Sequence, residues 1–354
     1  MQAVLETIQY ILKSGCELKA SDVHLTVGVP PIMRINGELR KFGEQVLQPA
    51  ETEKMAQSIV FSEKMWKEFN DKGELDFSYE IPGVSRFRVN VFKQRTNISL
   101  AIRIIPAAIP NIEELRLPNV MKRIAEKQQG LVLVTGPTGS GKSTTLAAMI
   151  RYMNETMRKH IITLEDPIEY VHSHGTSIID QREVGFDTQN FANGLRAALR
   201  QDPDVILVGE MRDLETIQTA ITAAETGHLV LGTLHTSSAP ATINRVIDVF
   251  PSAQQQQIRI QLASVLVSVI SQRLFQTSNK RERRVALEIL INNSAIANLV
   301  RNDKVHQIVN IMQTSRAQGM ITLDNSIKQL VQEGAIAKDI ALQYMQELSA
   351  HGTI

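Results

Sequence analysis

The sequence predicts an α/β protein in which an N-terminal α+β domain precedes a core built on a parallel sheet, with a helical C-terminal region. Three observations predict this class. Short apolar runs separated by turn residues fill positions 21–105, which is typical of an antiparallel sheet. Strand-like and helix-like segments then alternate between 131 and 234, as in parallel sheets covered by helices. Residues from about 254 onward predict mostly helix.

A length of 354 residues suggests two domains rather than one. We place the boundary in the segment 106–118, where Pro106, Pro110 and Pro118 favour an extended linker. The predicted division is therefore residues 1–105, linker 106–118 and residues 119–354.

In the first domain, apolar residues at helical spacing predict an amphipathic helix over 2–14 that stops at Gly15. Asn36-Gly37 predicts a hairpin turn, and a second helical stretch runs from about Ala50 to Phe69. The predicted strands lie at 22–27, 32–35, 38–40, 77–80, 85–91 and 99–105. In the second domain we expect strands at 131–135, 160–164, 205–209 and 229–234, and helices at 142–157, 190–200 and 213–226.

Composition excludes several classes of protein. Hydrophobic residues make up 43% and charged residues 21%, which indicates a globular chain, and the net charge of +1 does not indicate a broadly basic nucleic-acid-binding surface. A single cysteine, Cys16, permits neither an intramolecular disulfide nor a cysteine zinc site. The most apolar helix candidate, Leu262 to Ile270, is far shorter than a membrane span of about 18 residues or more. We therefore expect a soluble cytoplasmic protein without membrane insertion; attachment to a membrane through a partner stays open.

A phosphate-binding loop follows the predicted strand 131–135. The loop consists of Gly136, Pro137, Thr138, Gly139, Ser140, Gly141, Lys142, Ser143 and Thr144. Glycines let backbone N–H groups face one concavity, and the following helix N-terminus favours negative charge. Lys142 is expected to reach the β- and γ-phosphates and the Ser143 hydroxyl to ligate Mg²⁺. The predicted cofactors are therefore ATP and Mg²⁺.

Carboxylates follow two predicted strands of the same sheet. Glu165, Asp166 and Glu169 come after 160–164, and Glu210 follows the apolar run 205–209 in the manner of a Walker B acid. An acidic, solvated turn is the alternative for the first group. These acids can order Mg²⁺ and the attacking water, and the sequence leaves open whether Glu169 or Glu210 is the general base.

Two further groups are candidates. His228 and His235 bracket the strand 229–234, and His235, at its C-terminal end, is the better candidate for sensing the γ-phosphate. The arginines of the first domain that alternate on strands form either a solvated face or arginine fingers that reach a neighbouring subunit in a closed ring. They are Arg86, Arg88, Arg95 and Arg103.

The segments GPTGSGKST, EDPIEY, DPDVILVGEMRD and TGHLVLGTLHT together resemble those of the secretion-superfamily ATPases. In the first domain, SDVHL, PPIMRINGEL and SRFRVNVFKQR are similar to the PAS-like domain of that family. The chain looks most like the retraction subfamily. Gln272-Arg273-Leu274 is not followed by the four cysteines of assembly and secretion ATPases, and residues 295–302 stand in place of a C-terminal AIRNLIRE-type helix, departing from it at Ala297, Val300 and Asn302.

The resemblance implies a PAS-like domain linked to a RecA-like core, assembled as a homohexamer that hydrolyses ATP to retract type IV pili in twitching motility. Its partner would be an inner-membrane pilus platform protein, which would hold it at the cytoplasmic face of the membrane. The resemblance also assigns site residues. It places the phosphate and Mg²⁺ site at Lys142, Ser143 and Thr144, and the Asp box at Glu165, Asp166 and Glu169. Glu210 is the Walker B acid that holds Mg²⁺ through water, His235 lies in the His box, and Arg88 and Arg103 are the arginine fingers.

Several other functions remain as alternatives at this stage. The chain could be an accessory retraction paralogue, or a pilus assembly or type II secretion ATPase. A DNA-translocating RecA-like motor should show a basic channel, whereas the dense basic cluster Lys280-Arg281-Glu282-Arg283-Arg284 predicts an exposed loop. A nucleotide-binding ring scaffold without enzymatic activity is the third.

Overall fold

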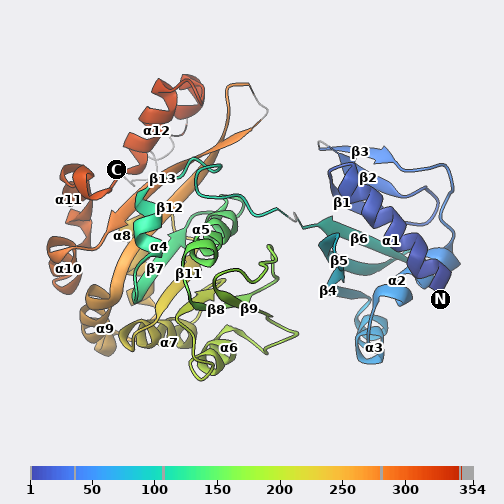
Figure 1. Ribbon diagram of the computed structural model, residues 1–354, viewed down its shortest axis with the longest axis horizontal. Coiled ribbons are helices and arrows are strands. Elements are labelled where there is room, and N and C mark those ends of the chain that lie inside the picture. Colours follow the sequence, from blue (N-terminus) through green and yellow to red (C-terminus); the bar gives the residue numbers. More distant parts are fainter. Residues whose placement is uncertain (1, 36, 106–107, 280–281, 343, 345–354) are drawn as a thin grey trace. The chain divides into compact units, whose positions relative to one another are not determined.

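The computed structural model describes residues 2–35, 37–105, 108–279, 282–342 and 344. It forms two compact units (Figure 1). The first contains the residues up to 108 together with 169–171, and the second contains 109–168 and the residues from 172 onward. The predicted α/β class, with an α+β unit before a P-loop core, is confirmed.

The first unit is an antiparallel sheet of order β3-β2-β1-β6-β5-β4 with three helices. The helices are α1 (Gln2–Glu17), α2 (Pro49–Ile59) and α3 (Glu63–Lys72). The strands are β1 (Ala20–Leu25), β2 (Ile32–Ile35), β3 (Glu38–Lys41), β4 (Glu74–Ile81), β5 (Ser85–Gln94) and β6 (Asn97–Ile104). Its core combines one face of the sheet with apolar residues of the helices, among them Leu12, Phe69 and Phe87.

Two helix predictions for this unit were wrong in detail. The first helix does not stop at Gly15: it continues to Glu17, and Gly15 lies where a Cβ would approach Ile104 Cδ1 to 3.0 Å, so glycine serves close packing there. The predicted helix from Ala50 to Phe69 is two helices, because Ser62 starts a new one by accepting a hydrogen bond from the backbone of Met65. Asn36, predicted in the hairpin turn, and Pro106 and Ala107, predicted in the linker, lie outside the described residues.

The second unit contains a sheet of order β13-β12-β7-β11-β10-β8-β9, parallel except for the β12–β13 pair. Its strands are β7 (Gly130–Thr135), β8 (His160–Glu165), β9 (Ile178–Glu183), β10 (Val205–Val208), β11 (Leu229–Leu234), β12 (Leu266–Gln276) and β13 (Arg283–Ile291). Helices cover both faces of the sheet (Figure 1). They are α4 (Val120–Ala125), α5 (Lys142–Thr156), α6 (Phe191–Ala198), α7 (Leu214–Glu225), α8 (Ala239–Asp248), α9 (Ser252–Val265), α10 (Ser294–Arg301), α11 (Ile308–Thr314) and α12 (Leu323–Gln332), with two 3₁₀ turns, Val305–Gln307 and Arg316–Gln318.

The C-terminal region is largely helical as predicted, but one stretch within it forms the two strands β12 and β13. The apolar run predicted as one helix, Leu262 to Ile270, divides at Val265, where α9 ends and β12 begins. β12 pairs in parallel with β7, which buries the run against the central strand of the core. Of the predicted basic loop, Lys280 and Arg281 lie outside the described residues, whereas Arg283 and Arg284 belong to β13.

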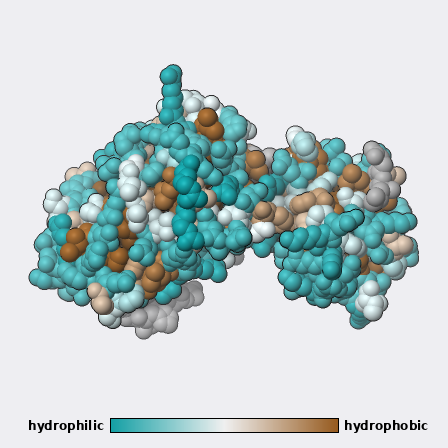
Figure 2. Space-filling model, turned by 90° about the horizontal axis from the view of Figure 1, so that it is seen from below, coloured by the Kyte–Doolittle hydropathy of each residue, from teal (hydrophilic) through white to brown (hydrophobic). Residues whose placement is uncertain are grey.

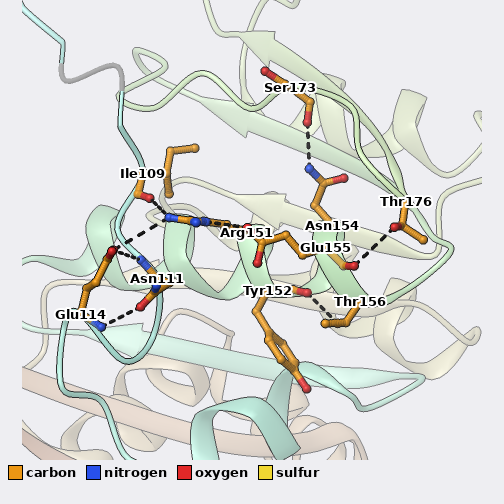
Figure 3. Close-up of polar contacts among 10 residues, drawn as sticks. All are labelled: Ile109, Asn111, Glu114, Arg151, Tyr152, Asn154, Glu155, Thr156, Ser173 and Thr176. Carbon is orange, nitrogen blue, oxygen red and sulfur yellow. Dashed lines mark hydrogen bonds and ion pairs between the residues drawn. The ribbon is translucent and has the colours of Figure 1, made fainter.

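The start of the second unit is tied to helix α5 (Figure 3). The guanidinium of Arg151 donates to the carbonyl of Ile109 and forms an ion pair with Glu155 at 2.8 Å. Asn111 and Glu114 close a turn beside it through reciprocal backbone-to-side-chain bonds of 2.8 and 2.7 Å. The helix that begins at the phosphate-binding loop therefore also anchors the chain where it enters this unit.

In the part of the chain that the structure describes, no helix combines the length and apolar character that crossing a membrane requires. The face drawn in Figure 2 is mostly hydrophilic on each unit, and its hydrophobic residues lie in small patches.

Candidate functional site

The phosphate-binding loop joins the end of β7 to α5 as the sequence predicts. Gly141 is the N-cap of α5, with a φ of 89° that favours glycine, and the helix begins at Lys142. The Lys142 ammonium donates to the carbonyls of Gly136 at 2.8 Å and of Pro137 at 3.1 Å, so its side chain folds over the loop. Ser143 is exposed at the start of the helix. The loop, its lysine and its hydroxyl thus lie on the carboxyl edge of the parallel sheet, where open α/β folds bind ligands.

Gln272, a residue that the sequence did not predict as part of the site, supports this loop from the neighbouring strand β12. Gln272 on β12 is buried, and its Nε2 donates to the carbonyl of Ser140 at 2.7 Å. Its backbone carbonyl lies so close to Gly136 that a Cβ there would approach it to 2.5 Å. In the sequence, Gln272 belongs to the QRL segment that marks the family, and nothing in its local pattern indicates contact with the loop.

Glu165 and Glu210 leave the same edge of the sheet on neighbouring strands. Val208 and Leu164 are partners in the parallel β10–β8 pair, and the backbone N–H of Gly209 donates to the carbonyl of Leu164 at 2.7 Å. Glu165 is held within the sheet, because its Oε1 accepts hydrogen bonds from Thr163 at 2.6 Å and from Gln181 at 3.1 Å. Those bonds orient Glu165 toward β8 and β9.

Glu210 and His235 are in contact. The strand β11 lies between β7 and β10, so the segment after it lies between the phosphate-binding loop and Glu210. His235 Nε2 lies 2.9 Å from Glu210 Oε1, and the guanidinium of Arg212 forms an ion pair with the same oxygen. Of the two histidines considered from the sequence, His228 lies at the opposite end of β11, with its Nδ1 3.0 Å from the carbonyl of Ala223. The structure therefore brings together the loop, Glu210 and His235.

Two of the predicted acids are more exposed. Asp166 follows Glu165 directly and is exposed. Glu169 is also exposed and belongs to the three residues that group with the first unit, so the choice between Glu169 and Glu210 as general base stays a prediction.

The candidate arginine fingers lie side by side on the first unit. Arg88 on β5 and Arg103 on β6 are directly opposite in the antiparallel pair, and both are exposed. Arg103 Nε donates to Asp22 Oδ1 at 3.1 Å. Burial alone raises the pKa of Asp22, but hydrogen bonds from Ser21 and Arg103 outweigh it and lower that pKa below its usual value. Of the other two arginines, Arg86 is half-buried and Arg95 lies in the turn between the strands. The role of Arg88 and Arg103 as fingers stays a prediction.

The residues at the loop fit a nucleotide with Mg²⁺. Gly136, Gly139 and Gly141 all have positive φ angles, a conformation in which backbone N–H groups can face one concavity. Ser143 and Glu210 offer the hard oxygen ligands that Mg²⁺ prefers. Across the described residues, no group of three or more His, Cys, Asp or Glu side chains could hold a metal ion by itself.

Comparison with known proteins agrees with this geometry. The family model described as "Type II/IV secretion system protein" matches residues 1–351. The chain is 48% identical to the type IV pilus retraction ATPase PilT of Pseudomonas aeruginosa over 96% of each chain. It is 40% identical to the type IV pilus ATPase PilU of the same organism, over 94% of this chain and 87% of that one. Among solved structures, the pilus retraction motor PilT with bound ADP is similar at 49% identity and a TM-score of 0.88, covering 94% of this chain and 95% of that one.

Proposed function

Because this chain belongs to the type II/IV secretion system protein family, we propose that it is an ATPase motor that retracts type IV pili. The observation that carries the proposal is the Glu210–His235 contact beside the phosphate-binding loop, in a chain 48% identical to PilT over nearly its whole length. The reaction is hydrolysis of ATP to ADP and phosphate.

The loop backbone, Lys142, Ser143 and Glu210 have separate tasks in this mechanism. The loop backbone and Lys142 bind the phosphates, and Lys142 must leave the carbonyls of Gly136 and Pro137 to reach them. Ser143 and Glu210 would hold Mg²⁺, Glu210 through water. When bound, Mg²⁺ neutralises charge that develops on the phosphates. Glu210 is also placed to orient the attacking water, and its contact with His235 joins the carboxylate to the segment after β11.

We extend the proposal to the assembly. Arg88 and Arg103 would act as fingers on the nucleotide of a neighbouring copy in a homohexameric ring. The ring would act at the cytoplasmic face of the inner membrane through a pilus platform protein.

An accessory retraction role is the second candidate, suggested by the departures of residues 295–302 from the retraction motif. Two of the departures from the retraction motif, Ala297 and Val300, are buried in the core and are therefore packing differences. Asn302, the third, is the C-cap of α10 and bonds to Asn298 on the helix. Asn302 is therefore the one departure from the retraction motif that is not a packing change in the core.

The chemical part of the proposal is tested with purified protein. We expect Lys142→Ala to abolish ATP turnover, and Glu210→Ala to retain ATP binding while losing hydrolysis. Turnover and binding of a fluorescent ATP analogue are measured side by side. Full ATPase activity in either variant would contradict the site assignment.

The cellular part is tested by deleting the gene and imaging pili. Excess pili that do not retract support the main retraction role, and retraction that continues at reduced force supports the accessory role. Cells without pili would instead indicate an assembly ATPase.

A further inference from the structure

A series of four hydroxyl groups, three of them buried, runs between the phosphate-binding loop and the segment that carries His235. Thr135, the last residue of β7, has its Oγ1 2.7 Å from Ser271 Oγ on β12. On its other side, Thr242 Oγ1 of α8 lies 3.5 Å from Thr135 Oγ1 and 2.6 Å from Thr236 Oγ1. Four hydroxyls from β12, β7, α8 and the β11–α8 segment therefore form one continuous series.

Three of these four hydroxyls lie in the interior, and Thr236 at the end of the series is half-buried. Thr135 and Thr242 are 0% exposed and Ser271 is 1% exposed. A buried hydroxyl that lacks a partner is costly, so each proton in the series must find an acceptor. The series is therefore a defined network, and its members cannot rotate independently.

The Thr242 hydroxyl can donate only one hydrogen bond at a time. Its hydroxyl has one proton but three acceptors within reach: Thr135, Thr236 and the carbonyl of Ser238 at 2.7 Å. In the contacts of Thr135 with Ser271 and of Thr236 with Thr242, either oxygen can donate. The single Thr242 proton is therefore shared by competition between the Ser238 carbonyl at 2.7 Å and the Thr135 hydroxyl at 3.5 Å.

The two ends of the network adjoin the two halves of the site. Thr135 directly precedes Gly136, the first residue of the phosphate-binding loop. Thr236 directly follows His235, whose Nε2 contacts Glu210 at 2.9 Å. The network therefore connects the group that binds phosphate to the partner of the carboxylate that orients water.

Helix α8 is fixed independently at its first residue. Glu288 on β13 is buried, and its Oε1 accepts a hydrogen bond from the backbone of Ala239 at 2.7 Å. This bond holds the start of the helix against the sheet, so loss of one hydroxyl contact leaves α8 in place. The network can therefore be altered one hydroxyl at a time.

We propose that Thr135, Ser271, Thr242 and Thr236 are positioning residues for hydrolysis, which hold the His235 segment in register with the phosphate-binding loop. The inference rests on the proposed function, because it concerns the same site. Its distinctive consequence is kinetic. Removing a hydroxyl at Thr242 or Ser271 leaves the loop itself intact, so ATP binding is retained while the hydrolytic step slows.

The test uses the full chain and pairs of matched variants. Thr242→Val removes the hydroxyl with almost no change of shape, and Thr242→Ser restores it. Ser271→Ala is matched by Ser268→Ala on the same strand, because Ser268 is also fully buried and donates to the carbonyl of Leu290 at 2.7 Å outside the network. We expect T242V and S271A to lower kcat about three- to tenfold with KM for ATP little changed, the range that loss of one hydrogen bond provides.

Equal kcat values for S271A and S268A, or wild-type kcat in T242V, would overturn the network while leaving the proposed function standing. The same result follows if T242S is as slow as T242V. Absence of turnover in the wild-type chain, measured beside K142A, would instead overturn the proposed function and the network together. Melting temperatures of S271A and S268A are compared as well, since both lose one buried hydrogen bond and a merely structural role would affect them alike.

Discussion

His160 begins β8, and both of its ring nitrogens face acceptors. Nε2 lies 2.9 Å from Asp180 Oδ2, and Nδ1 lies 3.0 Å from the carbonyl of Asp202. A neutral imidazole has one N–H, so only the protonated ring donates to both. Burial alone lowers the pKa of His160, but these hydrogen bonds outweigh it and raise the pKa above its ordinary value of 6.5.

A raised pKa of His160 predicts a definite dependence of stability on pH. The contribution is fully present below pH 6.5 and is lost as the pH rises through the raised value, because the folded state then releases the proton that both bonds require. We expect the difference in Tm between wild type and His160→Gln to be largest below pH 6.5 and to shrink above it. Asp180→Asn is expected to reduce the same dependence, and curves that stay parallel from pH 5.5 to 9 would contradict the prediction.

Lys142, Glu210 and His235 could be predicted from the sequence because each stands next to the end of an apolar strand in a recognisable order. Gln272 could not. Its contact with Ser140 joins positions 132 residues apart and exists only because β12 pairs with β7. Side chains that support a site from a distant strand leave no local pattern to read.

At the scale of elements, the loop between β7 and α5 depends on glycine at its first position. Gly136 has a φ of 143°, and a Cβ would lie 2.5 Å from the carbonyl oxygen of Gln272 and 2.6 Å from Ser140 Oγ. The nearest obstacle is the backbone of β12, which is held in the sheet between β7 and β13 and cannot easily move aside. An added methyl group must therefore displace the loop itself.

We expect Gly136→Ala to raise KM for ATP severalfold and to lower Tm more than Gly185→Ala does. Gly185 has a φ of +88° with no atom within 4 Å of a built Cβ, so its substitution adds backbone strain, of the order of 1–3 kcal/mol, without a collision. Thermal melts and ATP titrations of both variants provide the check. Equal effects would show that the close approach to Gln272 does not matter.

The alternating elements from 131 to 234 were predictable because their periodicity and flanking residues agree. The division of Leu262 to Ile270 into the end of α9 and the start of β12 was not. A short apolar run is compatible with either a helix or a buried strand, and only the place beside β7 decides it. Propensity was overridden there by tertiary pairing.

For the whole molecule, the proposed ring makes a prediction about mixtures. Lys142→Ala removes the lysine of the phosphate-binding loop, and Arg103→Ala removes the proposed finger in a different part of the chain. If the finger acts on a neighbouring copy, mixed rings contain some sites with both groups intact, and activity returns when the two inactive variants are mixed. The mass of the assembly, expected at about six times the 39.5 kDa chain, is measured on the same samples.

If mixing restores no activity although the variants assemble together, the fingers act within one chain or not at all.

The net charge of +1 also predicts that DNA leaves the ATPase rate unchanged. Stimulation by DNA would favour a nucleic-acid motor instead.

The tie between Arg151 and Ile109 gives the motor a load path. A force carried along the polypeptide from the first unit enters the second at Ile109, and the Arg151 guanidinium passes it to α5. The same helix begins at Lys142, so α5, 15 residues long, starts at the phosphate-binding loop and contacts the entering chain near its other end. Tension on the chain and binding of nucleotide would then act on the same helix, and mechanical load would change the affinity for nucleotide.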